Sequence, residues 1–388
     1  MTVLLTYGLR NIRARKITTG LTAGGMALVT FVFVAVLMLA EGLEYTLTET
    51  GRPENAIVLR GSAETEVGSV ISRGEASIIE TQPQIERDPS GEPIVAKETL
   101  VLVALPKMES GSLAHVTVRG VGPQSFALRP QVRLVAGRMF RPGSREIIVG
   151  SSIARRIENC CVGSQPQFAL SRWTVVGIFD AANTAFDSEI WGDVDQLMSA
   201  FRRNSYSAIL ARVPGRDEFQ EFSKQLQGDP RFTIQVKREL EFYRSQSEIM
   251  AKFIRILGMG MTIFFSLGAI LGAMVTMYAA VANRTAEIGT LRALGFTRAD
   301  ILSAFLAESL LIGLIGGLVG LLCGSLLQLL TISTLNWQTF SELAFGFKLT
   351  TQISAYGLAF ATAMGFLGGL LPAWRAGRLK IVDALRAS

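Results

Sequence analysis

The sequence predicts an integral membrane α-helical protein with four transmembrane helices, one before and three after a large extracytoplasmic α/β (α+β) domain. Of the 388 residues, 49% are hydrophobic and 18% are charged, and the mean hydropathy is +0.36. A soluble domain carries more charge than this. The uncharged residues also gather in four runs, each longer than the roughly 20 residues that cross a bilayer core. The runs are Ile17–Ala40, Ile256–Asn283, Ser309–Ser341 and Thr350–Trp374.

The first run has a cleaved signal peptide as its alternative interpretation, because basic residues precede its apolar core. That core is longer than the usual 7–15 residues, and no A-x-A cleavage site follows it cleanly. We therefore expect a retained membrane anchor.

The distribution of charge predicts the orientation. Residues 1–16, 284–300 and 375–388 hold 11 Lys/Arg against 3 Asp/Glu, whereas residues 42–252 hold 25 against 26. By the positive-inside rule, both termini and the 284–300 loop are expected in the cytoplasm of a bacterium, with residues 42–252 outside its inner membrane. The predicted parts are a basic N-terminal helix (1–16), spans at 17–41, 253–282, 300–331 and 351–374, a core domain ending in a stalk helix (42–252), a coupling helix and turn (283–299), an external loop (332–350) and a C-terminal segment (375–388).

The remaining composition excludes several functions. The net charge of +6 reflects membrane topology, so we do not expect nucleic acid as a partner. Cys160 and Cys161 are adjacent, and a disulfide between neighbours is strained; we expect ordinary thiols, with a bond between two copies of the chain as the alternative. No spacing suggests a metal site. We expect the lone His115 to be structural.

The 42–252 segment is predicted to form a folded domain of mixed secondary structure. Strands are expected at "NAIVLRG", "ETLVLVAL", "HVTVRGV", "REIIVG", "WTVVGIFD" and "SAILARV", which are short β-branched runs broken by Gly and Pro. Helices are expected at "SSIARRIEN", "DVDQLMSAFRR" and "RDEFQEFSKQLQ", and a turn at "QIERDPSGEP". The segment Arg238–Leu257 is helical in pattern and continues into the second span, as a stalk or as an ordinary linker helix.

Glycines recur at four-residue spacing in the third span, which lets another helix approach closely. Packing within one chain and a homodimer seam are both consistent with this pattern. The residues concerned are Gly313, Gly316, Gly317, Gly320 and Gly324. Similar pairs occur at Gly268 and Gly272 and at Gly20 and Gly24. Glu308, the one acidic residue in this apolar span, is a candidate for an ion relay.

The loop between the second and third spans predicts a helix, a tight turn and a second helix. Gly295 fits the C′ position of the first helix, and Thr297 with Asp300 fits a capping box with Asp in place of Glu. Ile288, Leu291 and Leu294 form one apolar edge beside charged residues. This edge either packs on neighbouring spans or the lipid surface, or it docks a cytoplasmic protein.

"NRTAEIGTLRALGFTRADILSAFLAESLLIGLIGGLVGLLCG" resembles the characteristic segment of the MacB/FtsX-type ABC transporter permeases, a family that includes the lipoprotein-releasing LolC and LolE. "LPAWRAGRLKIVDALRAS", "LRNIRARKITTGLTAGGMAL" and "EIIVGSSIARRI…CCVGSQ…FALSRWTVVGIFD" resemble the family's closing signature, its opening basic helix and the tail of its periplasmic core domain. The resemblance covers nearly the whole chain and is weakest over residues 50–130.

The resemblance implies a non-catalytic permease half of an exporter. It implies two copies of a cytoplasmic ABC ATPase subunit, a homodimer or a pairing with a homologous permease, membrane lipid around the spans, and room for a periplasmic adaptor or substrate protein. Its ATPase-coupling residues fall on Glu287, Gly289, Leu291, Arg292 and Gly295. The sequence itself holds no G-x-x-x-x-G-K-[ST] phosphate loop, so we expect no cofactor on these residues and ATP with Mg²⁺ on the ATPase, either a separate polypeptide or a lost fusion.

Three functions follow as hypotheses. The first is mechanically driven export of a lipid, lipoprotein, hydrophobic peptide or drug, because the spans offer few groups for a hydrated cargo. The second is an FtsX-like regulator of a periplasmic cell-wall hydrolase without transport, which the size of the 42–252 domain disfavours. The third is a membrane-anchored enzyme, for which the insert has no recognisable nucleophile setting.

Overall fold

The computed structural model describes residues 16–335 and 339–379, and the chain divides into two compact units. The helical unit comprises Met1–Glu41, Lys252–Leu330 and Phe347–Ser388. The sheet unit comprises Gly42–Ala251 and Thr331–Gly346. Residues 1–15 of the basic helix predicted at 1–16 and the final residues 380–388 lie outside the described residues.

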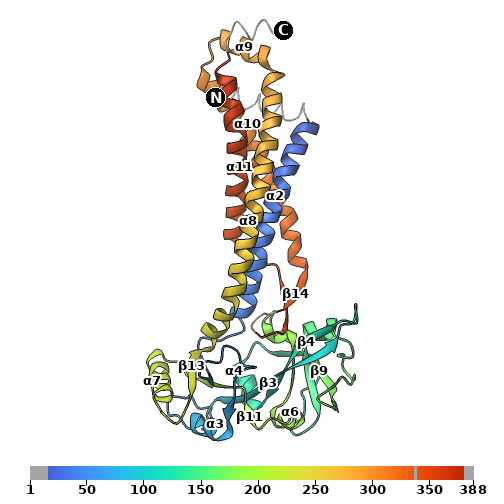
Figure 1. Ribbon diagram of the computed structural model, residues 1–388, viewed down its shortest axis with the longest axis vertical. Helices are drawn as coiled ribbons and strands as arrows, with labels where there is room; N and C mark the ends of the chain where they lie inside the picture. The colour runs from blue at the N-terminus through green and yellow to red at the C-terminus, as the bar shows by residue number, and fades with distance from the viewer. Residues whose placement is uncertain (1–15, 336–338, 380–388) are drawn as a thin grey trace. The chain divides into compact units, whose positions relative to one another are not determined.

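Four long helices account for the predicted spans (Figure 1). They are α2 (Lys16–Thr48), α8 (Glu239–Ala282), α10 (Arg298–Ser325) and α11 (Thr351–Gly377). Within the described ranges, these four are long and apolar enough to cross a membrane. The predicted arrangement of one helix before and three after a large mixed domain is therefore confirmed. Helix α8 runs without a break from Glu239 to Ala282, so the helix predicted over Arg238–Leu257 continues into the second span.

Two shorter helices complete the helical unit. Helix α9 (Thr285–Ala293) lies between α8 and α10 in sequence, and the 3-10 turn η2 (Leu326–Leu329) follows α10. Ion pairing between Arg255 and Glu41 (3.9 Å) joins α8 to α2 inside this unit.

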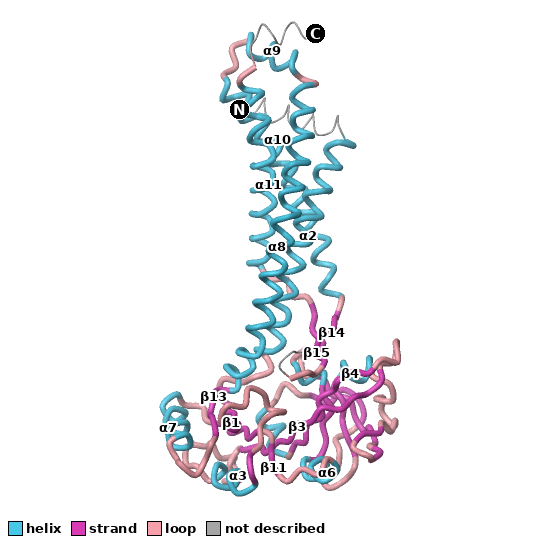
Figure 2. The backbone as a smooth tube through the Cα atoms, in the orientation of Figure 1, coloured by secondary structure: helices cyan, strands magenta, loops and turns pink. Residues whose placement is uncertain are grey.

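The sheet unit is built on one nine-stranded mixed sheet with the order β13-β1-β12-β3-β4-β10-β6-β9-β5. Its strands are drawn in magenta in Figure 2. Its strands are β1 (Asn55–Arg60), β3 (Val95–Pro106), β4 (Leu113–Val121), β5 (Arg133–Gly137), β6 (Glu146–Gly150), β9 (Thr174–Asp180), β10 (Glu189–Asp193), β12 (Ala208–Arg212) and β13 (Ile234–Arg238). The β4–β10 and β6–β9 pairs are parallel, and the other pairs are antiparallel. All six predicted strands are present.

Short elements surround this sheet. The helices are α3 (Arg73–Glu80), α4 (Pro123–Leu128), α5 (Ser151–Arg156), α6 (Val194–Ala200), α7 (Arg216–Gln227) and the 3-10 turn η1 (Ala185–Ser188), and the small strand pairs are β2 (Ile71–Ser72) with β11 (Ser205–Tyr206) and β7 (Gln167–Phe168) with β8 (Ser171–Arg172). The three predicted helices correspond to α5, α6 and α7. The predicted turn is also present: Asp88 accepts from the Ser90 amide at 2.8 Å, and Gly91 takes a φ of +88°.

Aromatic side chains pack around one tryptophan in the core of the sheet unit. Trp191 on β10 is fully buried and contacts Phe126, Phe179 and Phe186, with ring centroids 5.6, 5.0 and 5.4 Å away. Cys160 is buried and Cys161 is exposed, and neither forms a disulfide within the chain. The described residues contain no group of His, Cys, Asp and Glu that could hold a metal ion.

A hairpin from the C-terminal half of the chain completes the sheet unit. Strands β14 (Thr331–Leu335) and β15 (Glu342–Gly346) pair antiparallel where the sequence predicted only an external loop. Glu342 forms ion pairs with Lys107 (2.6 Å) and Arg156 (2.7 Å), and the Ala344 amide donates to Ser188 Oγ at 3.1 Å. The hairpin is thus fastened to a domain that is assembled almost entirely from the first two thirds of the chain.

Candidate functional site

The turn after α9 has the predicted geometry. Gly295 takes a φ of +100°, and its amide donates to the Arg292 carbonyl at 3.2 Å. The Phe296 amide donates to the Leu291 carbonyl at 3.2 Å. These two bonds make a Schellman motif with Gly295 at C′, where a residue without a Cβ avoids left-handed strain.

Helix α10 starts with the predicted capping box. Thr297 Oγ1 accepts from the Asp300 amide at 3.2 Å, and Asp300 Oδ2 accepts from the Thr297 amide at 2.8 Å. Two backbone donors at the helix start are satisfied in this way. The loop therefore holds α9 and α10 in a defined relation with only three residues between Leu294 and Arg298.

The apolar edge of α9 is divided between two environments. Ile288 is buried, and Leu291 is half-buried, among residues of α8, α10 and α11. Leu294 is 74% exposed. The packing interpretation therefore holds for Ile288 and Leu291, and only Leu294 is left as an exposed apolar side chain of this edge.

The exposed side of α9 carries a short mixed face. Glu287, Thr290 and Leu294 are exposed, and their three- and four-residue spacing places them on one side of the helix. Among the predicted coupling residues, Gly289 is buried and Arg292 is half-buried. Arg292 Nη1 donates to the Gly377 carbonyl at 3.1 Å. Three of the predicted residues thus face their own chain, and the outward face is Glu287, Thr290 and Leu294.

An ion pair that the sequence analysis did not predict fixes the start of α9. Arg284 Nη1 and Nη2 lie 3.0 and 3.4 Å from Glu308 Oε2 and Oε1 on α10. Both side chains are buried, at 4% and 8% exposure, and the Arg284 guanidinium lies 5.8 Å from the Phe305 ring centroid. Glu308, considered above as an ion relay, is engaged by this guanidinium. The signal available in the sequence was one acid within the apolar third span and one arginine at the start of the loop before it.

The glycines of the third span contact helices of the same chain. A Cβ atom at Gly313 would lie 2.7 Å from the Ala361 carbonyl oxygen of α11. On the neighbouring side of α10, a Cβ atom at Gly320 would lie 2.6 Å from the Ala27 carbonyl oxygen of α2. The predicted set of small residues, Gly313, Gly316, Gly317, Gly320 and Gly324, is buried in these two contacts. Close packing inside the helical unit therefore occupies both glycine faces of α10.

A second group of glycines lies on open surface. Nothing lies within 4 Å of a Cβ atom placed at Gly25 on α2, or at Gly268 and Gly272 on α8. Together with Leu21 and Leu28, they line an apolar groove of about 380 Å³ in the helical unit. These positions, rather than those of α10, leave backbone accessible to another helix.

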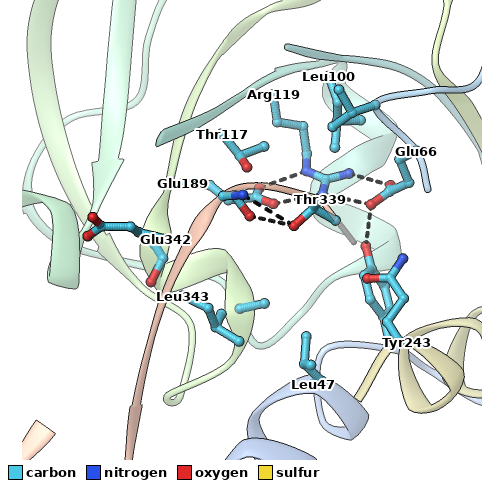
Figure 3. A pocket seen from close by; sticks show the side chains of 15 residues that line it. Leu47, Glu66, Leu100, Thr117, Arg119, Glu189, Tyr243, Thr339, Glu342 and Leu343 are labelled. Carbon is cyan, nitrogen blue, oxygen red and sulfur yellow. Dashed lines mark hydrogen bonds and ion pairs between the residues drawn. The ribbon is translucent and has the colours of Figure 1, made fainter. Parts of the chain in front are cut away.

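The sheet unit has a buried charged cluster centred on Arg119 of β4 (Figure 3). Arg119 Nη1 lies 2.8 Å from Glu66 Oε1 and 2.8 Å from Glu98 Oε2, and its Nε lies 2.7 Å from Glu189 Oε2. Tyr243 of α8 donates its hydroxyl to Glu66 Oε2 at 3.1 Å. One guanidinium therefore joins β3, β4, β10 and the first turns of α8.

Arg129 extends this cluster toward the start of α8. It forms an ion pair with Glu98 and lies 3.7 Å from Glu239 Oε1. Glu239 also accepts from Asn55 Nδ2 at 2.8 Å and from the Arg52 amide at 3.0 Å. The first turn of α8 is thus held to β1 and its preceding loop by polar contacts of the buried Glu239.

The cluster shifts the acidity of its members in opposite directions. Burial opposes ionisation of Glu98, but Arg129 and Arg119 lower its pKa to about 2. Burial raises the pKa of Glu239 despite its contact with Arg129. Glu98 is therefore the carboxylate that both arginines share. Without it, Arg119 keeps Glu66 and Glu189, but the buried Arg129 keeps only Glu239 at 3.7 Å.

Comparisons with known proteins find matches for both parts of the chain. Residues 19–228, more than half of the chain, match the MacB-like periplasmic core domain, and residues 259–381 match the FtsX-like permease C-terminal domain. The chain is 31% identical over 209 residues to the uncharacterized ABC transporter permease YknZ of Bacillus subtilis, covering 52% of this chain and 50% of that protein. It is 25% identical to the macrolide export ATP-binding/permease protein MacB of Bdellovibrio bacteriovorus, covering 98% of this chain and 61% of that protein.

The chain spans about half to three fifths of the length of these curated relatives. Among solved structures, it is similar to the periplasmic region of MacB from Actinobacillus actinomycetemcomitans, with 13% identity and a TM-score of 0.36, covering 52% of this chain and 92% of that one. The family matches cover both the first span with its sheet unit and the three C-terminal helices. The chain therefore belongs to the MacB/FtsX-type ABC transporter permeases, as a multi-pass membrane protein with a MacB-like periplasmic core domain and an FtsX-like permease C-terminal domain.

Proposed function

We propose that this chain couples ATP hydrolysis by separate ATPase subunits to movement of its periplasmic domain, for export of a hydrophobic or envelope substrate such as a lipid, lipoprotein, peptide or drug. The proposal rests on the contacts that hold α9 within the helical unit and on the face that they leave exposed. Its inward side is fixed by Arg284–Glu308 and by Arg292 on the Gly377 carbonyl. Its outward side presents Glu287, Thr290 and Leu294, a charged and apolar face suited to a groove on a partner protein.

The opposite end of α8 supports mechanical transmission. Helix α8 is continuous, and its first turns are held in the sheet unit by Glu239 and Tyr243. A force on α9 can then be transmitted along α8 to the charged cluster of the sheet unit. The spans themselves favour this scheme over passage of a hydrated cargo, because the buried acid Glu308 is neutralised by Arg284.

Two further elements complete the proposal. The combined excess of Lys/Arg over Asp/Glu in residues 1–16, 284–300 and 375–388 supports a cytoplasmic location for α9 and a periplasmic location for the sheet unit. A second copy of the chain, or a homologous permease, covers the groove along α2 and α8 that is lined by Gly25, Gly268 and Gly272. ATP and Mg²⁺ are held by two copies of the ATPase.

The test compares ATP hydrolysis by the purified permease–ATPase complex with hydrolysis by the ATPase alone. Glu287→Lys reverses the charge on the outward face of α9, and we expect it to abolish the permease-dependent change in hydrolysis while the chain stays folded. Glu158→Lys makes the same reversal at an exposed position of the sheet unit and serves as the matched control. Normal coupling in Glu287→Lys would remove this face from the proposal.

A further inference from the structure

A polar cavity of the sheet unit has no part in the coupling proposed above. Its volume is about 460 Å³, and it lies between the β14–β15 hairpin and a wall formed by α5, η1 and the turn after β3. Charged and hydroxyl side chains dominate the lining, whereas cavities that bind apolar ligands are mostly lined by hydrophobic and aromatic groups. The cavity is thus suited to a polar ligand.

The hairpin supplies a wall of small side chains. Thr331 pairs with Gly346 and Ser333 pairs with Ala344 across the two strands, and all four residues line the cavity. Since alternate residues of a strand share one face, the pairing register sets these four side by side. Two hydroxyls and two residues with little or no side chain leave room for a ligand backbone to approach.

Asp187 supplies an unsatisfied acceptor to the same cavity. Its side chain is buried, and Oδ1 accepts from the Ala181 amide at 2.8 Å and from Ser151 Oγ at 3.3 Å. Oδ2 has no hydrogen-bond partner among the described residues. A buried acceptor left without a donor costs about 1–3 kcal/mol, so this oxygen favours a ligand that brings an N–H group.

Arg155 supplies a cation one helical turn away. It follows Ser151 by four residues on α5, which is about 6 Å along the helix axis. Lys107 and Arg156 also line the cavity, but both form ion pairs with Glu342. Arg155 is exposed and makes no ion pair with any described residue. Its guanidinium can therefore take a ligand carboxylate through two parallel hydrogen bonds.

We propose that this cavity binds a short peptide with free ends, its ammonium group at Asp187 and its carboxylate at Arg155. An extended dipeptide spans about 7 Å and a tripeptide about 10 Å, lengths that match one helical turn plus the reach of the two side chains. Glu109 also lines the cavity and adds a second acidic side chain to it. The site goes beyond the proposed coupling function, since its lining lies wholly in the sheet unit and binding needs no ATPase.

The experiment is calorimetric titration of the full-length protein in detergent with tri-alanine, its C-terminal amide and its N-acetyl derivative. We expect saturable binding of tri-alanine that weakens at least about tenfold when either end is blocked, the loss of one charge-assisted contact. Arg155→Gln should weaken tri-alanine to the same degree and leave binding of the amide unchanged. Arg172→Gln, at an exposed arginine of β8 outside this cavity, is the matched control.

The blocked peptides keep the test decisive even where a variant fails to fold. Equal binding of all three peptides, or no saturable binding of tri-alanine at millimolar concentration, would overturn the assignment. Loss of ATPase coupling in Glu287→Lys with peptide binding intact would separate this site from the coupling face.

Discussion

Arg284 and Glu308 form a two-point ion pair inside the helical unit, at 3.0 and 3.4 Å, that joins the start of α9 to α10. Breaking a buried pair by removing one partner costs about 3–5 kcal/mol, because the other charge stays buried without a counterion. This pair therefore fixes the start of α9 to α10, and Arg292 on the Gly377 carbonyl is a second polar attachment further along α9.

The first prediction concerns this pair. Glu308→Gln should destabilise the helical unit by about 3 kcal/mol, and Arg284→Gln by a similar amount, whereas the double variant should recover most of that loss. Thermal unfolding in detergent of the wild type and the three variants measures the coupling energy. Additive effects of the two single substitutions would show that the charges do not depend on each other.

The second prediction separates the two groups of glycines. Gly320→Ala places a Cβ atom 2.6 Å from a carbonyl oxygen of α2, and backbone cannot move aside cheaply. We expect a loss of about 1–3 kcal/mol in the free energy of unfolding. Gly272→Ala meets nothing within 4 Å and should leave the stability of the single chain unchanged. Equal effects at the two positions, measured in the same detergent, would contradict the packing described here.

The third prediction concerns Glu98. Its pKa is about 2 in the folded protein, against an ordinary value of 4.5 for a glutamate, so the unfolded chain binds a proton first as pH falls. The stability that ionised Glu98 gives the folded protein is therefore complete above about pH 4.5 and is lost between about pH 4.5 and about pH 2. Glu98→Gln should cost about 3–5 kcal/mol at pH 7, with a smaller difference at pH 3.

Chemical unfolding across this pH range, followed by tryptophan fluorescence, measures the effect. Glu80→Gln removes the half-exposed partner of Lys97 and should cost no more than about 1 kcal/mol. A Glu98→Gln variant as stable as Glu80→Gln would mean that the buried cluster does not hold the sheet unit together.

The fourth prediction concerns Asp187, whose pKa is shifted in the opposite direction to that of Glu98. Burial raises its pKa from 3.8 to about 6, so the folded protein binds the proton more tightly than the unfolded chain. The wild type should lose stability as pH rises from about 4 to about 6. Asp187→Asn should be more stable than the wild type at pH 7.5, by up to about 3 kcal/mol, and similar to it at pH 4. An asparagine variant that is less stable at both pH values would contradict this.

Local signals in the sequence were sufficient for the four spans and for the turn between α9 and α10, but not for the short helices α3 and α4. The four spans follow from uninterrupted apolar runs, and the junction at Gly295 and Thr297 follows from residues whose preferences act within four positions. The strands at "NAIVLRG" and "WTVVGIFD" carry the same kind of local pattern. Strand β10, with the text "EIWGD", lacks it, because its central position in the sheet is set by neighbours rather than by alternation.

The contacts that define the candidate sites are long-range and could not be predicted. Arg119 gathers acids from positions 66, 98 and 189, and no spacing rule links these residues. The hairpin joins the sheet unit through Glu342, far along the chain from Lys107 and Arg156. The resemblance to a family placed the coupling segment, but only the packing distinguishes the outward Glu287 and Leu294 from the inward Arg292.

The central proposal is that α9 docks an ATPase, and the most direct measurement is a gentle pull-down of the tagged protein from its native membranes with mass spectrometry of the recovered proteins. We predict a roughly stoichiometric protein with a G-x-x-x-x-G-K-[ST] loop, lost in Glu287→Lys and retained in Glu158→Lys. Recovery of no such ATPase in several detergents, or equal recovery in both variants, would contradict the docking role of α9.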